Sequence, residues 1–424
     1  MIENLLQTIV GFVDTLFMAK LGLAEVAAVG VTNAILAVYL AIFMAMGIGT
    51  SSLIARSVGA GELDKAKAIA RQSTLISAAL GIIFGLITFF FAEPLLRMMG
   101  AEPDVLAGGV IYFRIVAVPA ILISLMTVFG SILRAAGDTK TPMKVGLYVN
   151  FIHIVLDYVF IFGFVGIGGW GIAGAAWATV ISRLVGVVIL YRFIRRSKLS
   201  FLLWNSSVIQ DLTMPILRIS TPVAIERIIM RLGQVLYFGL IVRIGTEVYA
   251  AHMIAANIEI FSYMPGYGLA VAATTLVGQH LGANRKNDAY QYGLLTAGIA
   301  VVFMSFVGVL LFTLSPIAAK WFTDQTDVID MVTTALRIDA FAQPFLAIGL
   351  VVAGALQGAG DTKSPMYSTA IGMWLIRVVG IYILCIYLGM GIAGVWLSIA
   401  IDLFLRALYL LFRYIRLFNA KEAS

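Results

Sequence analysis

Long apolar stretches separated by short polar turns run along the whole chain, and they predict twelve helices long enough to cross a membrane. The expected helices cover residues 1–19, 25–57, 64–92, 104–135, 140–165, 170–196, 211–243, 248–282, 286–314, 328–358, 363–388 and 391–417. Only the stretch after residue 193 has the polar, irregular character of a linker. The pattern predicts an all-α integral membrane protein with an N-terminal six-helix lobe (1–197), a cytoplasmic linker (198–210) and a C-terminal six-helix lobe (211–424).

An internal repeat supports the division into two lobes. The segment LRAAGDTKTPM at 133–143 recurs as LQGAGDTKSPM at 356–366, a spacing of 223 residues. The same spacing places SSLIARSVGA (51–60) over TTLVGQHLGA (274–283). An even number of spans in each half makes the repeat parallel, with its pseudo-two-fold axis along the membrane normal. Two such lobes are typical of secondary transporters, in which a cleft between the lobes opens alternately to either side.

The repeated AGDTK segment is predicted to be a turn, because it lacks the GxxxxGK[ST] spacing of a nucleotide-binding loop. We expect Gly137 and Gly360 to permit the backbone bend, and Pro142 and Pro365 to begin the next helix. Nucleotide hydrolysis within this chain is therefore not expected.

Composition agrees with a polytopic membrane protein. Of the 424 residues 61% are hydrophobic and 12% charged, and the mean hydropathy is +1.00, whereas soluble domains carry about 25% charged residues. The net charge of +7 does not indicate nucleic acid, because lysine and arginine gather in the loops of one side. The opposite loops hold only Lys20, Arg97, Arg243 and Lys320. This asymmetry predicts that both termini are cytoplasmic, in the cytoplasmic (inner) membrane.

Ionisable residues inside the spans are costly, so they are candidates for function. Asp14 lies near the middle of the first apolar stretch. Counting from the helix ends places both Asp14 and Asp157 about 10 Å below the outer surface, where they can share one site. Asn150, His153 and Asp157 occupy one helical face, and Thr179 reaches the same depth on the next helix.

Several motifs resemble those of the multidrug and toxic compound extrusion transporters, especially the branch related to the DNA-damage-inducible protein F. They are TLFMAKLG followed by AAVG, GTSSLIARSVGAG, the paired turns LRAAGDTKTP and LQGAGDTKSP, AAHMIAAN and LVGQHLGANR. The resemblance implies two six-helix lobes that form a V-shaped cleft. It also implies export of cationic or amphipathic compounds in exchange for protons or sodium ions.

The same resemblance implies a proton- or cation-binding network at Gln7, Asp14, Asp157 and Thr179. Where archaeal relatives have an asparagine, this chain has His153, which replaces an amide oxygen with a titratable ring and favours a proton relay over a sodium site. Our hypothesis is that Asp14 is the main coupling acid and Asp157 its hydrogen-bond partner. No cofactor or metal is expected, with sodium as the alternative coupling ion.

The other candidates carry weaker signals. Contacts to a drug are expected, on weak grounds, from Asp14, Met18, Met126, Phe129 and Tyr148. The acid pair has no counterpart in the second lobe, whose ionisable candidates are Glu226, Arg231, Glu259 and Asp339. Structural ion pairs are the favoured interpretation of the charges in that lobe.

Taken together, the residues predict a monomeric multidrug efflux antiporter that exchanges drugs for protons by alternating access, with membrane lipids around it and no nucleic-acid partner. Sodium coupling is the first alternative. A flippase for a lipid-linked saccharide is the second, although that function would favour extra helices or a strongly basic central cavity. An enzyme is not expected, because no nucleophile, metal or phosphate motif appears at membrane depth.

Overall fold

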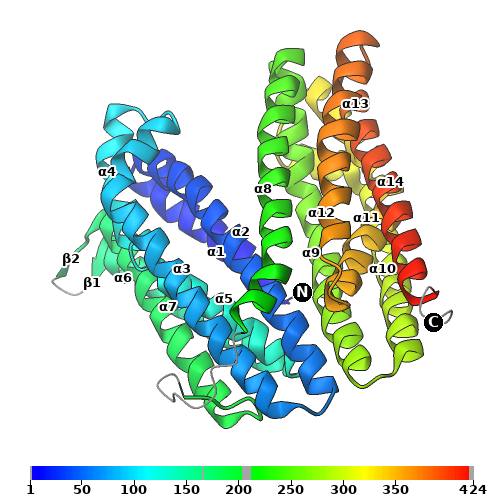
Figure 1. The fold of residues 1–424 in the computed structure, drawn as a ribbon. Helices are drawn as coiled ribbons and strands as arrows, with labels where there is room; N and C mark the ends of the chain where they lie inside the picture. The colour runs from blue at the N-terminus through cyan, green and yellow to red at the C-terminus, as the bar shows by residue number, and fades with distance from the viewer. Residues whose placement is uncertain (1, 165–166, 203–211, 420–424) are drawn as a thin grey trace. The chain divides into compact units, whose positions relative to one another are not determined.

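The computed structural model describes residues 2–164, 167–202 and 212–419, which are almost entirely helical (Figure 1). Contacts divide the chain into an N-terminal unit (Ile2–Ile54 and Glu62–Ser220) and a C-terminal unit (Ala55–Gly61 and Thr221–Ser424). The long helices α2 and α8 each contribute residues to both units. Part of the predicted linker 198–210 lies outside the described residues.

The first half of the chain forms seven helices and one short hairpin. They are α1 (Ile2–Leu21), α2 (Leu23–Gly59), α3 (Leu63–Met98), α4 (Pro103–Ala117), α5 (Ala120–Ala135), α6 (Lys140–Phe162), β1 (Gly163–Phe164), β2 (Ile167–Gly168) and α7 (Gly171–Arg196). The two strands pair antiparallel, with Gly163 opposite Gly168. Phe43 and Phe113 lie in the core of the N-terminal unit and are fully buried.

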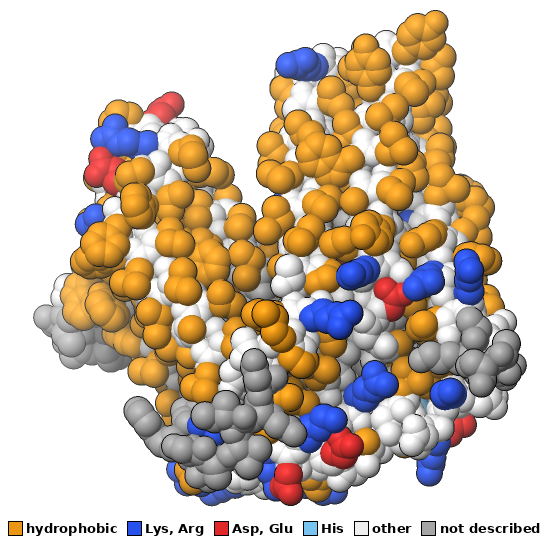
Figure 2. Space-filling model, in the orientation of Figure 1, with side chains coloured by type: hydrophobic (Ala, Val, Ile, Leu, Met, Phe, Trp, Pro, Cys, Tyr) orange, Lys and Arg blue, Asp and Glu red, His pale blue; other side chains and the backbone are white. Residues whose placement is uncertain are grey.

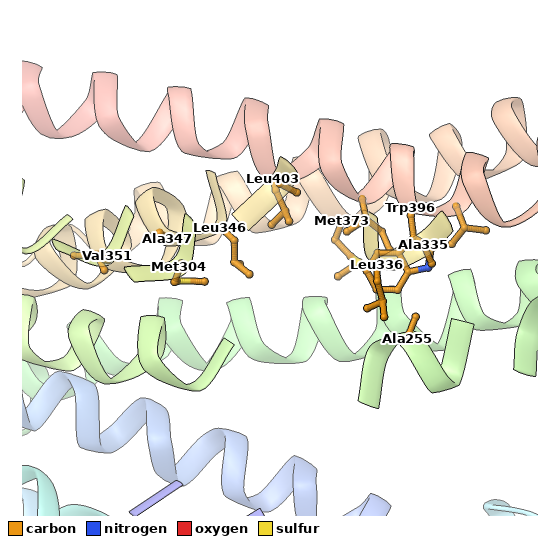
Figure 3. Close-up of a cluster of buried hydrophobic side chains, with 14 of the residues drawn as sticks. Ala255, Met304, Ala335, Leu336, Leu346, Ala347, Val351, Met373, Trp396 and Leu403 are labelled. Atoms are coloured by element: carbon orange, nitrogen blue, oxygen red, sulfur yellow. The ribbon is translucent and has the colours of Figure 1, made fainter. Parts of the chain in front are cut away.

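The second half consists of long helices, one of which contains π-helical turns. They are α8 (Thr213–Ile244), α9 (Thr246–Gly282), α10 (Lys286–Lys320), α11 (Thr326–Gly358), α12 (Lys363–Ala370), the π-helical η1 (Ile371–Val378), α13 (Val379–Ile381), the π-helical η2 (Tyr382–Tyr387) and α14 (Gly391–Asn419). Figure 3 shows the core of this unit, in which Leu336, Met373 and Trp396 pack around the small side chains of Ala255 and Ala335.

Counting α4 with α5, and α12 through η2, as one helix each, all twelve predicted helices are present in the described residues. Nine helices are long and apolar enough to cross a membrane, and the bent pair of α4 and α5 makes a tenth. The two that are not in this set are α1 and α8. Figure 2 shows apolar side chains over much of the visible surface of each unit, with most of the visible charged side chains in the lower half of the view.

The structure repeats with the spacing read from the sequence. Helix α9 begins and ends 223 residues after α2. Gly61, which follows α2, and Asn284, which follows α9, both have a positive φ, of 76° and 60°. The predicted AGDTK turns are confirmed, since Gly137 and Gly360 have φ values of 94° and 87°, a region that glycine adopts without steric cost.

An aspartate holds each of these turns in the same way. The Asp138 carboxylate accepts a hydrogen bond from the Thr141 amide at 2.9 Å, and Asp361 accepts one from the Ser364 amide at 3.0 Å. Helices α6 and α12 begin at the lysine two residues after each aspartate. The repeated sequence therefore starts a helix in the same way in both halves. The first amides of a helix have no carbonyl partner within it, and here the aspartate side chain accepts a hydrogen bond from one of them.

Five predicted helix assignments are wrong in detail. The helices expected to end at residues 92 and 314 continue to Met98 (α3) and Lys320 (α10). The helix expected at 104–135 is broken into α4 and α5, which meet at 45°, because Pro119 has no amide proton and its ring excludes the preceding turn. The helix expected to reach residue 165 ends at Phe162, because Gly163 takes a φ of 84°. The segment 363–388 is not a regular α-helix, since η1 and η2 interrupt it.

Two glycines at equivalent positions of the repeat allow a close backbone crossing within the C-terminal unit. A Cβ atom at Gly59 would collide with the backbone of Gln279, and one at Gly282 would collide with the backbone of Arg56. We expect Gly59→Val and Gly282→Val each to lower the free energy of unfolding by about 1–3 kcal/mol, because the added methyl groups overpack the crossing.

Thermal unfolding of the purified protein in detergent would measure this effect. Gly298→Val is the matched control, because nothing lies within 4 Å of a Cβ atom placed there. If Gly59→Val and Gly298→Val unfold at the same temperature, the crossing does not depend on glycine.

Candidate functional site

Four of the predicted site residues come together inside the N-terminal unit. Asp14 lies on α1, His153 and Asp157 on α6, and Thr179 on α7. The His153 ring is central, with Nδ1 3.8 Å from Asp14 Oδ1, Nε2 3.5 Å from Asp157 Oδ2, and Nε2 3.0 Å from the Thr179 hydroxyl. Helices α1, α6 and α7 pack against one another, so regular secondary structure positions the cluster.

The three ionisable side chains of this cluster differ in how much of their surface is exposed. The Asp157 side chain is 2% exposed, that of His153 12% and that of Asp14 31%. Asp157 is held among protein atoms, whereas Asp14 presents part of its surface to the exterior of the unit. Asp14 is therefore the member of the cluster that a proton, an ion or a ligand reaches first.

The Asp14 and Asp157 carboxyl groups both lie beside the His153 ring, and one oxygen of each lies within 4.8 Å of the other. Two carboxylates this close repel each other, and a proton or another cation placed between them relieves that repulsion. Such a pair is a chemically reasonable place to exchange a proton for a cationic ligand.

The hydrogen-bond network indicates the tautomer of His153. The Thr179 hydroxyl donates its single proton to the carbonyl oxygen of Ala175, at 3.0 Å. It must then accept the hydrogen bond from His153, which places a proton on Nε2. Nδ1 faces Asp14 and is left to take up or release a proton, so the ring can relay protons to or from the acid pair.

The same three ligand groups fit a small cation. One ligand atom from each of Asp14, His153 and Asp157 lies within 4.8 Å of the others. These distances admit either a shared proton or an ion with two carboxylate ligands and one imidazole ligand, and the geometry of the trio does not select between them.

Sequence reasoning missed two residues of this site. Tyr112 on α4 is buried and hydrogen-bonded to Thr179. Arg183 on α7 lies close enough to Asp14, Tyr112 and His153 to interact electrostatically with each of them. Arg183 could have been found from the sequence, because it follows Thr179 by four residues and so lies on the same helical face. Tyr112 carried no such signal, since only the packing of α4 brings it here.

Two other predicted network residues lie outside these contacts. The side chain of Gln7 falls outside the part of the chain whose side chains the structure describes. Asn150 lies one turn before His153, half-buried, and its amide nitrogen has no hydrogen-bond partner among the described residues. Asn150 therefore lies beside the cluster, outside the contacts described above.

The weaker substrate candidates have different surroundings. Met18 and Phe129 are each only 2% exposed, and Phe129 stacks on Tyr191, so neither offers surface to a ligand in this structure. Met126 is half-buried beside Gly186. Tyr148 is exposed and lines a surface depression of α6 together with Lys144, Leu147 and Phe151.

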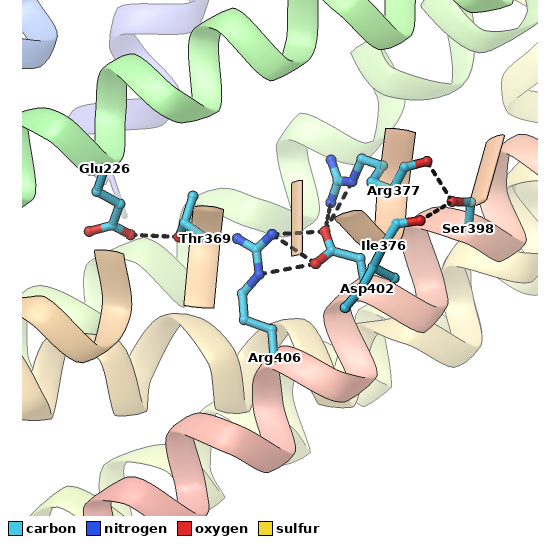
Figure 4. A network of polar contacts seen from close by, with 7 residues as sticks. All are labelled: Glu226, Thr369, Ile376, Arg377, Ser398, Asp402 and Arg406. Atoms are coloured by element: carbon cyan, nitrogen blue, oxygen red, sulfur yellow. Dashed lines mark hydrogen bonds and ion pairs between the residues drawn. The ribbon is translucent and has the colours of Figure 1, made fainter. Parts of the chain in front are cut away.

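Four charged residues of the C-terminal unit, Glu226, Arg377, Asp402 and Arg406, form a connected network through Thr369 (Figure 4). Asp402 on α14 is fully buried and accepts hydrogen bonds from Arg377 at 2.8 Å and from Arg406 at 2.8 Å. Arg406 also approaches the Thr369 hydroxyl at 3.4 Å, and that hydroxyl donates to Glu226 at 2.9 Å. The Asp402 carboxylate is therefore the counter-charge of two arginines, an arrangement typical of a structural ion cluster.

The π-helical turns belong to the same region. The Ser398 hydroxyl lies within hydrogen-bonding distance of the carbonyls of Ile376 and Arg377, at 3.4 Å and 2.9 Å. Widened turns leave carbonyls without regular helical partners, and a side chain from a neighbouring helix compensates for this loss. The π-helical path of η1 thus depends on α14.

The remaining second-lobe candidates are spread around this network. Glu259 on α9 is close enough to Arg377 and to Asp339 to interact electrostatically with both. Asp339 is buried and accepts a hydrogen bond from Gln343 at 2.6 Å. Arg231 is exposed and bonds to Gln234 at 3.1 Å.

Known proteins of one family resemble this chain in both sequence and structure. The MatE family model matches residues 1–159 and 222–383, well over half of the chain. A probable multidrug resistance protein NorM of Thermotoga maritima is 32% identical over 414 residues, which cover 96% of this chain and 88% of that protein. The multidrug resistance protein PmpM of Pseudomonas aeruginosa is 26% identical, with coverages of 88% and 79%.

Solved structures with the same fold agree with these sequence matches. A crystal structure of MATE in the bent conformation superposes with a TM-score of 0.92 at 25% identity, covering 100% of this chain and 94% of that one. A structure of a MOP superfamily transporter from Pyrococcus furiosus gives a TM-score of 0.92, also at 25% identity and with the same coverages. The resemblance inferred from the sequence motifs is confirmed, as is the all-helical, twelve-helix architecture.

Proposed function

Because the chain belongs to the MatE family of membrane transporters, we propose that it is a multidrug efflux antiporter that exports cationic or amphipathic compounds in exchange for protons. The multidrug resistance names of its relatives support the cargo. The observation that supports proton coupling is the titratable ring of His153, which lies 3.8 Å from Asp14 Oδ1 and 3.5 Å from Asp157 Oδ2 and so can exchange protons with both acids. We also propose a monomer in the cytoplasmic membrane, with both termini cytoplasmic.

The proposed cycle uses one site for two cations in turn. A proton entering from outside neutralises the acid pair and releases the cargo, and loss of that proton to the cytoplasm restores the negative charge that attracts the next cation. His153 lies between the two acids and hands protons between them. Competition for Asp14 couples the opposing fluxes, because cargo and proton do not occupy the carboxylate together.

Sodium coupling is the second candidate, and the specific observation in its favour is the trio of ligand atoms within 4.8 Å. Transport in proteoliposomes separates the two. With a fluorescent organic cation as cargo, we expect transport when only a pH gradient is imposed, its loss on adding a protonophore, and no response to a sodium gradient at constant pH. Transport driven by sodium at constant pH, and insensitive to the protonophore, would refute proton coupling.

A further inference from the structure

Three aromatic rings lie together where α1 packs against α6. The centre of the Phe17 ring is 6.3 Å from that of Tyr158 and 5.7 Å from that of Phe162, and the centres of the Tyr158 and Phe162 rings are 5.7 Å apart. Phe17 belongs to α1, and the other two residues belong to α6. Distances of this size are those of interacting aromatic pairs, so Phe17, Tyr158 and Phe162 form one aromatic cluster.

The aromatic cluster lies next to Asp14 along the same two helices. Asp14 on α1 lies beside His153 on α6. Phe17, three residues later on α1, lies beside Tyr158, five residues later on α6. The contacts therefore advance in the same direction on both helices, and a rise of about 1.5 Å per residue places Phe17 about 5 Å further along α1 than Asp14. Residues three apart are neighbours on the surface of a helix, so Phe17 and Asp14 can contact the same ligand.

The aromatic cluster presents ring surface to a ligand. Tyr158 is 54% exposed and Phe162 is 38% exposed, while Phe17 is partly buried. The Asp14 side chain is also partly exposed. A single small molecule can therefore contact a carboxylate and several aromatic rings at once.

A positive charge already lies on this cluster. The Lys20 Nζ atom is 5.9 Å from the centre of the Phe162 ring, a distance at which the negative face of the ring attracts a cation. Lys20 is exposed, and its long side chain can move away from the ring. Its ammonium group therefore occupies a position that a cationic ligand can take over.

We propose that the aromatic cluster is a cation–π subsite for the cargo. An aromatic or quaternary ammonium cation lies against Phe17, Tyr158 and Phe162 with its charge near Asp14, and Lys20 competes with it for the rings. The proposal rests on the proposed export of cationic compounds and specifies which cations this site favours. Ring faces attract a cation without requiring one fixed hydrogen-bond geometry, which suits cargoes of varied shape.

Fluorescence titration of the purified protein with ethidium, an aromatic cation, tests the proposal. We expect Tyr158→Leu and Phe162→Leu each to weaken ethidium binding about 3- to 10-fold, because each removes a ring and keeps an apolar side chain. Tyr158→Phe keeps the ring, so its affinity should stay within about twofold of wild type. Phe151→Leu is the matched control, because it removes an exposed ring of α6 that pairs with no other ring in the described part of the chain.

Substitution of Lys20 tests the competition and leaves the three rings in place. Lys20→Met is expected to bind ethidium about 3-fold or more tightly than wild type, because it removes a competing cation, whereas Lys20→Arg keeps the charge and should bind ethidium as wild type does. Neither variant should change the affinity for the uncharged probe N-phenylnaphthylamine, since that molecule does not compete through charge.

Anchoring of helices at the membrane–water interface is the alternative role of such aromatic residues. It predicts that the ring variants lower the unfolding temperature without changing ethidium affinity, and that Lys20→Met binds ethidium as wild type does; this result would overturn the proposal while proton-driven export stands. If the ring variants do not fold, unchanged ethidium binding by Lys20→Met would overturn it alone. If wild type neither binds nor exports ethidium, the cationic cargo of the proposed function is wrong as well.

Discussion

Replacing Asp14 with asparagine is expected to abolish proton-driven efflux, to the level of liposomes without protein. The amide keeps the size of the side chain but can neither release a proton nor attract a cation by charge. Asp14 is the most exposed carboxyl of the cluster, so it is the group that cargo can reach. We expect affinity for an organic cation to fall by about 30-fold or more, because loss of one partner of a desolvated charge pair costs about 2–5 kcal/mol.

Transport in proteoliposomes under a pH gradient, and fluorescence titration with the same cation, would measure these two effects. Asp330→Asn is the control, since it makes the same chemical change at an exposed position of α11. Because the two acids lie in one cluster and are proposed to act as a unit, Asp14→Asn combined with Asp157→Asn should be no worse than Asp14→Asn alone. Normal proton-driven efflux by Asp14→Asn would refute the assignment of Asp14 as the coupling acid.

The fold was largely predictable because its information is local and repeated. Apolar segments of sufficient length, short turns and the 223-residue spacing locate the helices without reference to tertiary structure. The positive φ angles at Gly137 and Gly360 follow from a glycine placed at the same point of a repeated turn. The family resemblance rested on these same motifs, and the comparisons confirmed it.

Features that depend on contacts between helices were not predictable in this way. The π-helical turns around Arg377 need the Ser398 hydroxyl, which comes from a helix 21 residues further along the chain. Pro119 signals a break in its helix, but the 45° bend depends on how α4 and α5 pack. Such features arise from tertiary structure that overrides the local preference of a sequence.

The candidate site was predictable in part for the same reason. Depth and helical periodicity were sufficient to place Asp14 and Asp157 together, and to put His153 and Thr179 beside them. Periodicity also points to Arg183, four residues after Thr179. Only the tertiary structure, however, shows that this arginine lies near ionisable groups on α1, α4 and α6. Tyr112 joins the site because α4 packs against α7, a contact that the sequence pattern does not indicate.

Asp402, in the C-terminal unit, is a buried acid that we expect to stabilise the fold, in contrast to the transport role proposed for Asp14. Replacing Asp402 with asparagine is expected to lower the free energy of unfolding by about 3–5 kcal/mol, because it leaves two buried guanidinium groups without their shared counter-charge. The side chains of Arg377 and Arg406 are only 12% and 14% exposed, so solvent compensates little for the loss. Thermal unfolding of the detergent-solubilised protein would show a large decrease in transition temperature.

Asp361→Asn is the matched control, because its ion pair with Arg413, at 3.0 Å, is partly exposed. Surface pairs contribute about 0–1 kcal/mol, and asparagine still accepts the hydrogen bond that begins α12. Replacing Asp402, Arg377 and Arg406 together with asparagine, methionine and methionine should recover much of the stability, because the uncompensated charges are then gone. Wild-type stability of Asp402→Asn would mean that Glu226 or Glu259 can replace Asp402 as the counter-charge.

Activity distinguishes the two kinds of acid. At temperatures where Asp402→Asn remains folded, we expect its proton-driven efflux per folded molecule to stay within about twofold of wild type, because a structural ion pair adds stability without entering the transport cycle. Asp14→Asn should show the reverse, with a transition temperature close to that of wild type and no efflux. If Asp402→Asn loses efflux while folded, the network of Arg377, Asp402 and Arg406 takes part in transport, and coupling is not confined to the N-terminal unit.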